Sequence, residues 1–458
     1  PNTHVCPVCL GMPGVLPTIN KRAIEFTMMT ALALNCGIRQ FAKFDRKNYP
    51  YPDLMKGYQI SQYDAPIGEK GWLEINTDEG SKTIGITRVH LEEDVAKLSH
   101  HTVSNGGSYS LMDVNRSGVP LMEIVSEPDM RTPEEAREYL MKLRSILQYL
   151  GVSTGNMEEG SFRCDANISI RPVDSKDFLS KVEVKNMNSF RAVYRALEYE
   201  ASRQRKEMET GGKLVQETRG WMEDKGVTVS QRSKEYAHDY RYFPEPDLPP
   251  LVFENDWVES IKKDLPELPD AIRMRLMSEY GLSQYDANLL VDSKAMAQYF
   301  EDCIGIIKNN INGADINKKA KVLSNWLLGD FSKMINSTNT RIENVKIKPK
   351  NLVEMLDIID KGALSGPSAK AVFEEMFTDG KTANDIINEK GLVQISDSSE
   401  IESIVMQVID SNSQAVQDFK DGKQPAIGFL VGQVMKASKG RANPGLAKEI
   451  LLDKLGGH

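Results

Sequence analysis

The sequence contains no run of about 18 apolar residues, so it predicts no membrane-spanning helix. Cysteine is scarce, with five residues in the whole chain. Their number is odd and, apart from Cys6 and Cys9, they are scattered along the sequence. This distribution fits a reducing compartment better than a disulfide framework. The common motifs G-x-x-x-x-G-K-[ST], G-x-G-x-x-G, G-x-S-x-G and H-E-x-x-H are also absent. A nucleotide, if the protein uses one, must therefore bind at a less common kind of site.

The protein has little excess of positive charge, since its net charge is -8 and its pI is near 5.5. These values argue against a wholly basic nucleic-acid binder but not against a local basic site. The 458 residues, 40% hydrophobic and 27% charged, describe an ordinary soluble protein. A chain of this length exceeds one compact core, so we expect about two to four domains.

Residues 1–264 mix short alternating runs with strong helix signals and predict an α+β domain. Asn20 is placed to cap one helix, and Thr132, Pro133 and Gly151 bracket a second one. The stretch "WLEINTDEGSKTIGITRVHL" predicts a hairpin that turns at residues 78–80. "CDANISIRPV" and "SKVEVKNM" predict a second antiparallel pair of strands.

The segment "DLPELPD" begins the C-terminal part of the chain, where helical periodicity replaces the mixed pattern. We expect an all-helical domain over residues 265–390, which links the first domain to the last. Residues 391–458 are predicted to form a small helical tail domain. The tail carries a local excess of positive charge in an acidic protein, and its basic residues include Lys436, Lys439 and Arg441. Such a face suits a phosphate backbone, although it is equally typical of a solvated helix surface.

The stretch "RVHLEEDVAK" contains three consecutive acidic residues at the end of a predicted strand. If the strand continues, one face carries Arg88, His90, Glu92 and Asp94. Glu93 then falls on the apolar face, where a carboxylate needs a cation, a metal or several donors. The alternative is that the strand ends at Leu91 and the three acids form a solvated turn.

Glu123 raises the same question within "VPLMEIVSEPD", because its neighbours are typical of a strand buried on both faces. Two carboxylates in such positions, Glu93 and Glu123, suit Mg²⁺, which leaves room for waters and phosphates. The alternative is a buried ion pair of Glu123 with Arg88 or Arg116.

The second antiparallel pair has a polar face of mixed charge and amide groups. Its members include Arg163, Asp165, Asn167, Lys185 and the adjacent Asn186. This composition indicates a substrate-binding wall, while an ordinary solvent face of an antiparallel sheet is the simpler interpretation. Two stiff loops, "FDRKNYPYPD" with Lys47 and "HDYRYFPEPD" with Arg241, display cations that suit phosphates, although such loops also simply pack.

Cys6 and Cys9, in "HVCPVCLG", supply two of the four ligands that a structural Zn²⁺ requires. Cys36 and Cys164 lie in a helix end and a strand, so neither is an obvious third ligand. His4 could serve only with strained local geometry.

Several long stretches, in the same order along the whole chain, resemble one family. They are "KFDRKNYPYPDLMKGYQISQYDAPIGEKG", "GITRVHLEEDVAK", "VNRSGVPLMEIVSEPDMR", "MEEGSFRCDANISIRP", "DYRYFPEPD" and "GFLVGQVMKASKGRANP". They are similar to the B subunit of the glutamine-dependent aspartyl/glutamyl-tRNA amidotransferases. The resemblance implies a β-rich catalytic cradle at residues 1–264 and a tRNA-binding tail.

The resemblance implies that the protein uses ATP and Mg²⁺ to phosphorylate the side chain of a misacylated Glu-tRNA or Asp-tRNA. Ammonia from a glutaminase subunit of the amidase fold, braced by a small third subunit, would then give Gln-tRNA or Asn-tRNA. On this view the chain lies in the bacterial cytoplasm or in an organellar matrix and binds no membrane.

Physical arguments then assign roles to the residues within this reaction. The catalytic candidates are Lys47, His90, Glu92, Glu93 and Glu123, of which Glu93 and Glu123 would bind Mg²⁺. The candidates for binding ATP and substrate are Arg88, Arg163, Asp165, Asn167, Lys185 and Asn186. Lys436, Lys439 and Arg441 would contact tRNA, and Cys6 and Cys9 would form half of a zinc site.

One departure from the family concerns the first residues. Family members open with a Gly-Leu-Glu-x-His strand, and some carry a Cys-x-Cys pair shortly before the position of Cys6. The printed sequence contains neither, so we expect part of the metal shell to lie outside it and this chain to be inactive in activation by itself. Two other interpretations stay open: a zinc-ribbon protein that only binds tRNA, and a scaffold that only organises partner subunits.

Overall fold

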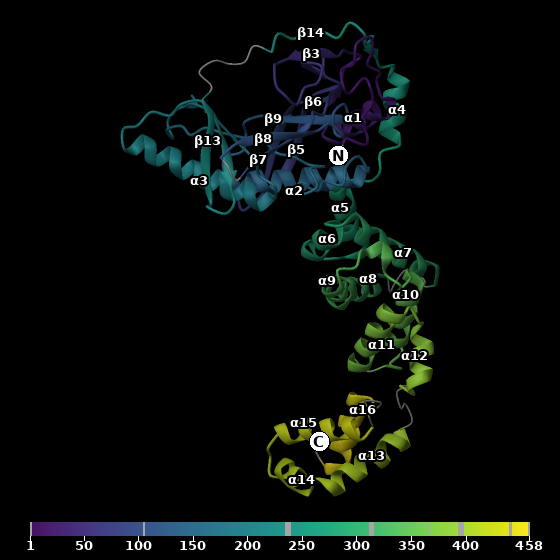
Figure 1. Ribbon diagram of the computed structural model, residues 1–458. Helices are drawn as coiled ribbons and strands as arrows, with labels where there is room; N and C mark the ends of the chain where they lie inside the picture. The colour runs from purple at the N-terminus through teal and green to yellow at the C-terminus, as the bar shows by residue number, and fades with distance from the viewer. Residues whose placement is uncertain are drawn as a thin grey trace. The chain divides into compact units, whose positions relative to one another are not determined.

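The protein is described from a computed structural model that covers residues 2–103, 106–233, 240–310, 316–364, 366–392, 398–438 and 442–456 (Figure 1). Contacts within the chain divide it into two units, Pro1–Leu268 and Pro269–His458. The first unit contains strands and helices and the second is helical, so the predicted α+β class is confirmed. The finer division at residue 390 stays a prediction.

The main sheet of the first unit has the strand order β1-β5-β6-β9. Its strands are β1 (Gly37–Ile38), β5 (Gly68–Thr77), β6 (Gly80–Glu93) and β9 (Pro120–Ser126), and all neighbours are antiparallel. The predicted hairpin is confirmed, since Thr77 pairs with Gly80 across the turn between β5 and β6. Strand β6 continues to Glu93, so the alternative in which it ends at Leu91 is wrong.

Two helices with local capping signals form the core with this sheet. In α1 (Lys21–Ala33) the Asn20 side chain accepts hydrogen bonds from the backbone N–H groups of Arg22 and Ala23. In α2 (Pro133–Leu150) Thr132 accepts from the backbone of Glu135, and Gly151 ends the helix with φ 71°. The apolar stripe of α2 packs with β5, β6, Ala31 and Ala33 in one hydrophobic cluster, while Ala23, Ile24 and Met28 of α1 belong to a second cluster. Both predicted helices are therefore confirmed.

Strand β9 differs from the prediction that it is buried on both faces. It is an edge strand whose only neighbour in the sheet is β6, and six of its seven residues are of intermediate exposure. A run of apolar residues does not distinguish an edge strand whose faces are half covered from a central strand. Glu123, in the middle of β9, consequently has a side chain that is 43% exposed.

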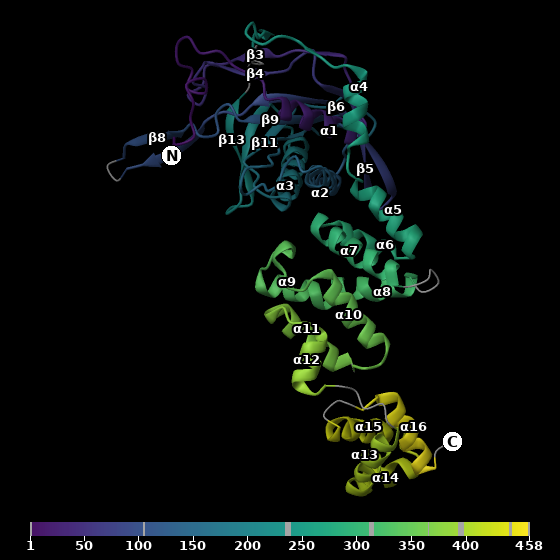
Figure 2. The same ribbon diagram turned by 90° about the vertical axis from the view of Figure 1, so that its right-hand side faces the viewer.

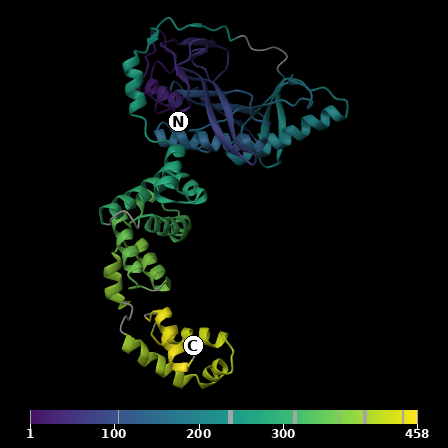
Figure 3. The same cartoon turned by 180° about the vertical axis from the view of Figure 1, so that it is seen from behind.

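A second sheet follows in the order β10-β11-β12-β13 (Figure 2). Its strands are β10 (Ala166–Ile168), β11 (Val182–Lys185), β12 (Glu217–Met222) and β13 (Val227–Ser233). The predicted antiparallel pair is confirmed, with Asn167 opposite Glu183. Helix α3 (Phe190–Glu209) connects the parallel strands β11 and β12 and packs beside α2 (Figure 3).

Smaller sheets complete the first unit. Strands β14 (Phe243–Pro244), β3 (Asp45–Asn48) and β4 (Tyr58–Ser61) form a three-stranded sheet, in that order, and β15 (Leu251–Val252) pairs with β2 (Phe41–Ala42). The segment that contains residues 240–253 is thereby tied to the beginning of the chain, where α4 (Asn255–Lys263) packs on α1. A hairpin of β7 (Lys97–Thr102) and β8 (Ser108–Asp113) projects from the unit (Figure 2).

The second unit contains helices and no strand among its described residues. The helices are α5 (Pro269–Tyr280), α6 (Gln284–Val291), α7 (Lys294–Asn310), α8 (Ile316–Trp326), α9 (Ser332–Thr338), α10 (Pro349–Asp360), α11 (Gly366–Asp379), α12 (Ala383–Lys390), α13 (Ser398–Ser411), α14 (Ser413–Lys420), α15 (Pro425–Ala437) and α16 (Pro444–Leu455). A π-helical turn, Leu327–Phe331, separates α8 from α9, and a short 3-10 turn spans Ile342–Asn344. Helices α13, α15 and α16 share a hydrophobic cluster of their own. Within the described part of the chain, none of the helices has the length and apolar character needed to cross a bilayer.

Gly71 lies where β5 passes the end of α1, and this close approach gives a stability prediction. A Cβ atom at Gly71 would overlap the Cys36 sulfur and the backbone oxygen of Leu34. We expect Gly71→Ala to lower the free energy of unfolding by about 1–3 kcal/mol, because the backbone cannot give way without strain. Gly37→Ala is the matched control, since the nearest atom to its Cβ would be 3.8 Å away. Urea unfolding followed by tryptophan fluorescence measures both, and equal midpoints for the two variants would contradict the prediction.

Candidate functional site

Strands β6 and β9 bring three ionisable side chains together. His90 and Glu123 are directly opposite each other across the two strands, and Glu92 follows His90 on the same face of β6. The His90 Nε2 atom lies 3.7 Å from Glu92 Oε2 and 3.7 Å from Glu123 Oε2. One ligand atom from each residue lies within 4.8 Å of the others. We call His90, Glu92 and Glu123 the acid cluster; the side chains of His90 and Glu92 are buried, while that of Glu123 is partly exposed.

Glu92 is the buried carboxylate of the acid cluster. The Ser61 hydroxyl donates to Glu92 Oε2 at 3.1 Å, and Lys47 Nζ lies 4.0 Å from the same oxygen. Burial disfavours the ionised form, but His90, Lys47 and Ser61 together outweigh it and hold the pKa of Glu92 below its usual value. The carboxylate is therefore ionised at neutral pH although it is buried.

Arg88 sets the orientation of His90. The Arg88 Nε–H group donates to His90 Nδ1 at 3.3 Å. An imidazole that accepts at Nδ1 carries its proton on Nε2 when neutral, and this tautomer follows from the hydrogen-bond network. The Nε2–H group then faces the two carboxylates, so Glu92 and Glu123 are the groups left to bind a cation in this arrangement.

Glu93, expected to bind Mg²⁺ together with Glu123, lies on the other face of β6. Its Oε1 atom lies 2.5 Å from Lys56 Nζ and accepts from the backbone N–H of Ile60 at 3.0 Å. The strand's alternation separates neighbouring residues, so the structure groups Glu92 with Glu123 and pairs Glu93 with a lysine. The structure thus places Glu93 and Glu123 on opposite faces of the sheet, and their binding of Mg²⁺ stays a prediction.

Lys47, a predicted catalytic residue, lies on β3 beside the acid cluster. Besides its approach to Glu92, its ammonium group lies 5.2 Å from the centroid of the Tyr240 ring. Tyr240 belongs to the stretch "HDYRYFPEPD", which the sequence predicts to be a loop. The sequence does not predict that this loop lies beside β3. His238 of that stretch lies outside the described residues. Tyr240 is therefore a neighbour of the site that sequence reasoning missed.

Comparisons with known proteins address the family. The description "GatB/GatE catalytic domain" matches residues 1–259, and "GatB domain" matches residues 309–455. The chain is 59% identical to the B subunit of an aspartyl/glutamyl-tRNA(Asn/Gln) amidotransferase of Dehalococcoides mccartyi over 453 residues, which are 98% of this chain and 92% of the relative. It is 53% identical to that of Carboxydothermus hydrogenoformans over 455 residues, 99% of this chain and 92% of the relative. The chain belongs to the family of amidotransferase B subunits.

The membership confirms the resemblance that the motifs predicted. The chain is also 54% identical to the B subunit of Moorella thermoacetica over 455 residues, which are 99% of this chain and 93% of the relative. The acid cluster lies in the part of the chain that matches the catalytic-domain description of the family.

Arg163 and the polar residues of the second sheet lie apart from the acid cluster in their hydrogen bonds. Arg163 Nη2 donates to Asp94 Oδ2 at 2.8 Å, and Arg116 Nε lies 3.0 Å from the same oxygen. Lys185 Nζ donates to Asp165 Oδ2 at 2.8 Å between neighbouring strands. Asn167 and Asn186 are exposed, and Asn186 has φ 66°. The structure thus pairs Arg163 with Asp94 beyond the end of β6, and the role of this wall in binding stays a prediction.

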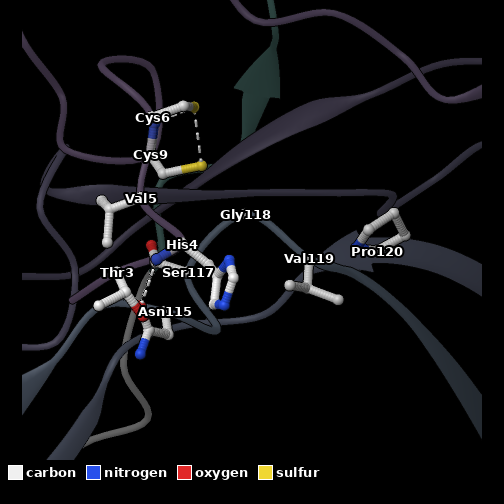
Figure 4. Close-up of a pocket in the computed structure, with 10 residues that line it drawn as sticks. All are labelled: Thr3, His4, Val5, Cys6, Cys9, Asn115, Ser117, Gly118, Val119 and Pro120. Carbon is white, nitrogen blue, oxygen red and sulfur yellow. Dashed lines mark hydrogen bonds between the residues drawn. The ribbon is translucent and has the colours of Figure 1, made fainter. Parts of the chain in front are cut away.

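Cys6 and Cys9 place their sulfur atoms 3.2 Å apart at the edge of a pocket of about 510 Å³. Figure 4 shows that the His4 ring, which also lines this pocket, lies apart from both sulfurs. The backbone N–H of Cys9 donates to the Cys6 sulfur, and this bond lowers the pKa of the Cys6 thiol. Two neighbouring cysteine sulfurs are half of the donor set of a structural zinc site, so Cys6 and Cys9 could supply two of the four ligands.

The basic residues of the tail are described only in part. Lys436 is exposed in the last turn of α15. Lys439 and Arg441, the other two predicted tRNA contacts, lie outside the described residues. The tRNA-binding surface therefore stays a prediction.

Proposed function

We propose that this chain contributes the acid cluster with which a tRNA amidotransferase activates, by phosphorylation with ATP, the side-chain carboxylate of glutamate or aspartate on a misacylated tRNA. The acylphosphate would then react with ammonia to give Gln-tRNA or Asn-tRNA. The observation that carries the proposal is the convergence of Glu92 and Glu123 beside Lys47, His90 and Arg88. The names of the relatives, which are subunits of an aspartyl/glutamyl-tRNA amidotransferase, agree with it.

The acid cluster has the donor set that suits Mg²⁺. Two carboxylates with space for waters and phosphate oxygens are typical of magnesium in phosphoryl-transfer sites. Glu92 and Glu123 would hold the ion, which when bound neutralises negative charge on the transferring phosphoryl group. Glu123 is the more exposed of the two, so the open side of the site lies at the edge strand β9.

The other side chains prepare and orient the site. Ser61 and Lys47 keep Glu92 ionised, and the Arg88 hydrogen bond keeps the Nε2–H of His90 directed at both carboxylates. The ammonium group of Lys47 lies 4.0 Å from Glu92, which is longer than a hydrogen bond. Its positive charge is therefore also available to a phosphate group. A substrate carboxylate is already ionised at neutral pH, so the phosphorylation step requires positioning and charge neutralisation and no general base.

The proposal includes the partners that the reaction needs. A glutaminase subunit of the amidase fold would supply ammonia, a small third subunit would support the assembly, and the basic tail with Lys436, Lys439 and Arg441 would contact the body of the tRNA. Cys6 and Cys9 would hold Zn²⁺ as a structural ion. The bond that forms joins carbon and nitrogen, so the enzyme class would be a carbon–nitrogen ligase with glutamine as amido donor.

Glu123→Gln tests the proposed activation in the protein assembled with its partner subunits. We expect ATP-dependent release of ADP in the presence of Glu-tRNA to fall about tenfold or more, since one anionic ligand is lost. Glu127→Gln is the control, because Glu127 is exposed just beyond β9 and hydrogen-bonds Thr87. Unchanged ADP release in Glu123→Gln, with tRNA binding retained, would indicate a tRNA-binding protein or a scaffold instead.

A further inference from the structure

Tyr63 and Tyr242 form a pair of stacked rings next to the acid cluster, in which Tyr63 is exposed and Tyr242 is half-buried. Their ring centroids are 4.3 Å apart and the ring planes differ by 10°. Tyr63 follows β4 and Tyr242 precedes β14, so the pair joins two segments that are far apart in the sequence. Tyr63 is 54% exposed, so the stack is not a contact of the hydrophobic core.

The backbone on both sides of the stack is firmly held. The Tyr63 N–H group donates to Asp45 Oδ2 at 3.0 Å, and the Asn48 side chain donates to the Arg241 carbonyl at 2.9 Å. Arg46 binds the buried Glu245 through two hydrogen bonds, of 2.7 and 2.8 Å, three residues after Tyr242. The backbone that carries the two rings is therefore held in place, and a stacked pair with one exposed ring is suited to a ligand with a flat face.

Contacts connect the stack to the acid cluster by two routes. Ser61, two residues before Tyr63, donates to Glu92. On the other side, the Tyr240 ring lies 6.0 Å from the Tyr242 ring, and Lys47 Nζ lies 5.2 Å from the Tyr240 ring. A nucleotide whose base lay on the stack could direct its phosphate groups toward Lys47.

The charge of the stack suits a nucleotide as well. A tyrosine hydroxyl is neutral at physiological pH, and burial together with the negative charge of Glu92 raises the pKa of Tyr242 further. A neutral π face attracts a nucleobase without repelling its phosphates.

We propose that Tyr63 and Tyr242 form a stacking platform for an adenine base. The proposal rests on the proposed function, in which two ligands carry adenine: ATP and the 3′-terminal adenosine of the tRNA. Stacking does not depend on which of these carries the base, and every base offers a π face to an aromatic ring. The two sources are distinguished by experiment.

The test compares Tyr63→Leu with Tyr63→Phe in the complete assembly. Leucine keeps an apolar contact with Tyr242 but has no π face, whereas phenylalanine keeps the ring. Binding of a non-hydrolysable ATP analogue is measured in one arm by calorimetry. Binding of aminoacyl-tRNA, and of the same tRNA without its terminal adenosine, is measured in the other arm. Neither arm requires turnover, so the result is independent of whether Glu123→Gln lowers ADP release.

We expect Tyr63→Leu to weaken the binding of one of these ligands about tenfold, because one base–ring contact is lost. Tyr63→Phe keeps the ring and should bind both ligands as the wild type does. Weaker binding of the ATP analogue alone assigns the platform to ATP. Loss of the preference for tRNA with its terminal adenosine assigns it to the tRNA. Tyr51→Leu, on a tyrosine that is 52% exposed, is the control. Unchanged binding of both ligands in Tyr63→Leu, or equal losses in Tyr51→Leu, would overturn the proposal.

Discussion

Glu92→Gln should lower the rate of ATP-dependent activation by about 10²- to 10³-fold, as removal of a charged group preorganised in an active site does. Glu92 is the buried member of the acid cluster, and its negative charge is maintained by His90, Lys47 and Ser61. Glutamine keeps the size and the hydrogen bond from Ser61 but removes the charge that would bind Mg²⁺. The measurement is ADP release with Glu-tRNA in the complete assembly as the Mg²⁺ concentration is varied.

The control for this prediction is Glu74→Gln on β5, where the side chain is exposed on the same sheet. It should leave the rate unchanged. Higher Mg²⁺ should recover part of the activity of Glu92→Gln, because Glu123 still offers one carboxylate. A rate within about twofold of wild type at low Mg²⁺ would show that Glu92 does not take part in activation.

Arg46→Met should lower the free energy of unfolding of the first unit by about 3–5 kcal/mol, the usual cost of leaving one partner of a buried ion pair alone. Glu245 has a fully buried side chain and loses both hydrogen bonds from Arg46. Urea unfolding at pH 7 measures the effect. Arg195→Met is the control, because the Arg195–Glu223 pair is exposed and should contribute about 1 kcal/mol or less.

The destabilisation in Arg46→Met should depend on pH. Burial opposes ionisation of Glu245, but Arg46 outweighs it and lowers the pKa of Glu245 in the folded protein. A carboxylate with a lowered folded pKa stabilises the fold above its unfolded pKa, about 4.3, and this contribution is lost as the pH falls through the folded value. The difference between wild type and Arg46→Met should therefore shrink below about pH 4. If the difference in the free energy of unfolding grew on acidification, this account would be contradicted. Replacing both Arg46 and Glu245 by apolar residues should restore much of the stability.

The site was predicted from the sequence in its residue types but only partly in its arrangement. His90, Glu92 and Glu123 were all candidates, because acids within apolar strand patterns are unusual. The structure groups Glu92, and not Glu93, with Glu123, since register across two strands decides which acids meet. The sequence shows that Glu92 and Glu93 face opposite ways, but not which of them shares a face of the sheet with Glu123, because that depends on the register between β6 and β9.

Local signals account for what the sequence by itself determined about this protein. The caps at Asn20 and Thr132, the turn before Gly80 and the alternation in β10 and β11 act within a few residues, and the structure confirms each element. The motifs determined the family, which the relatives confirm. Only the tertiary structure decided that β9 is an edge strand, that Glu93 pairs with Lys56 and that Tyr242 stacks on Tyr63. These contacts join segments separated by tens to hundreds of residues, so they depend on packing that no local pattern encodes.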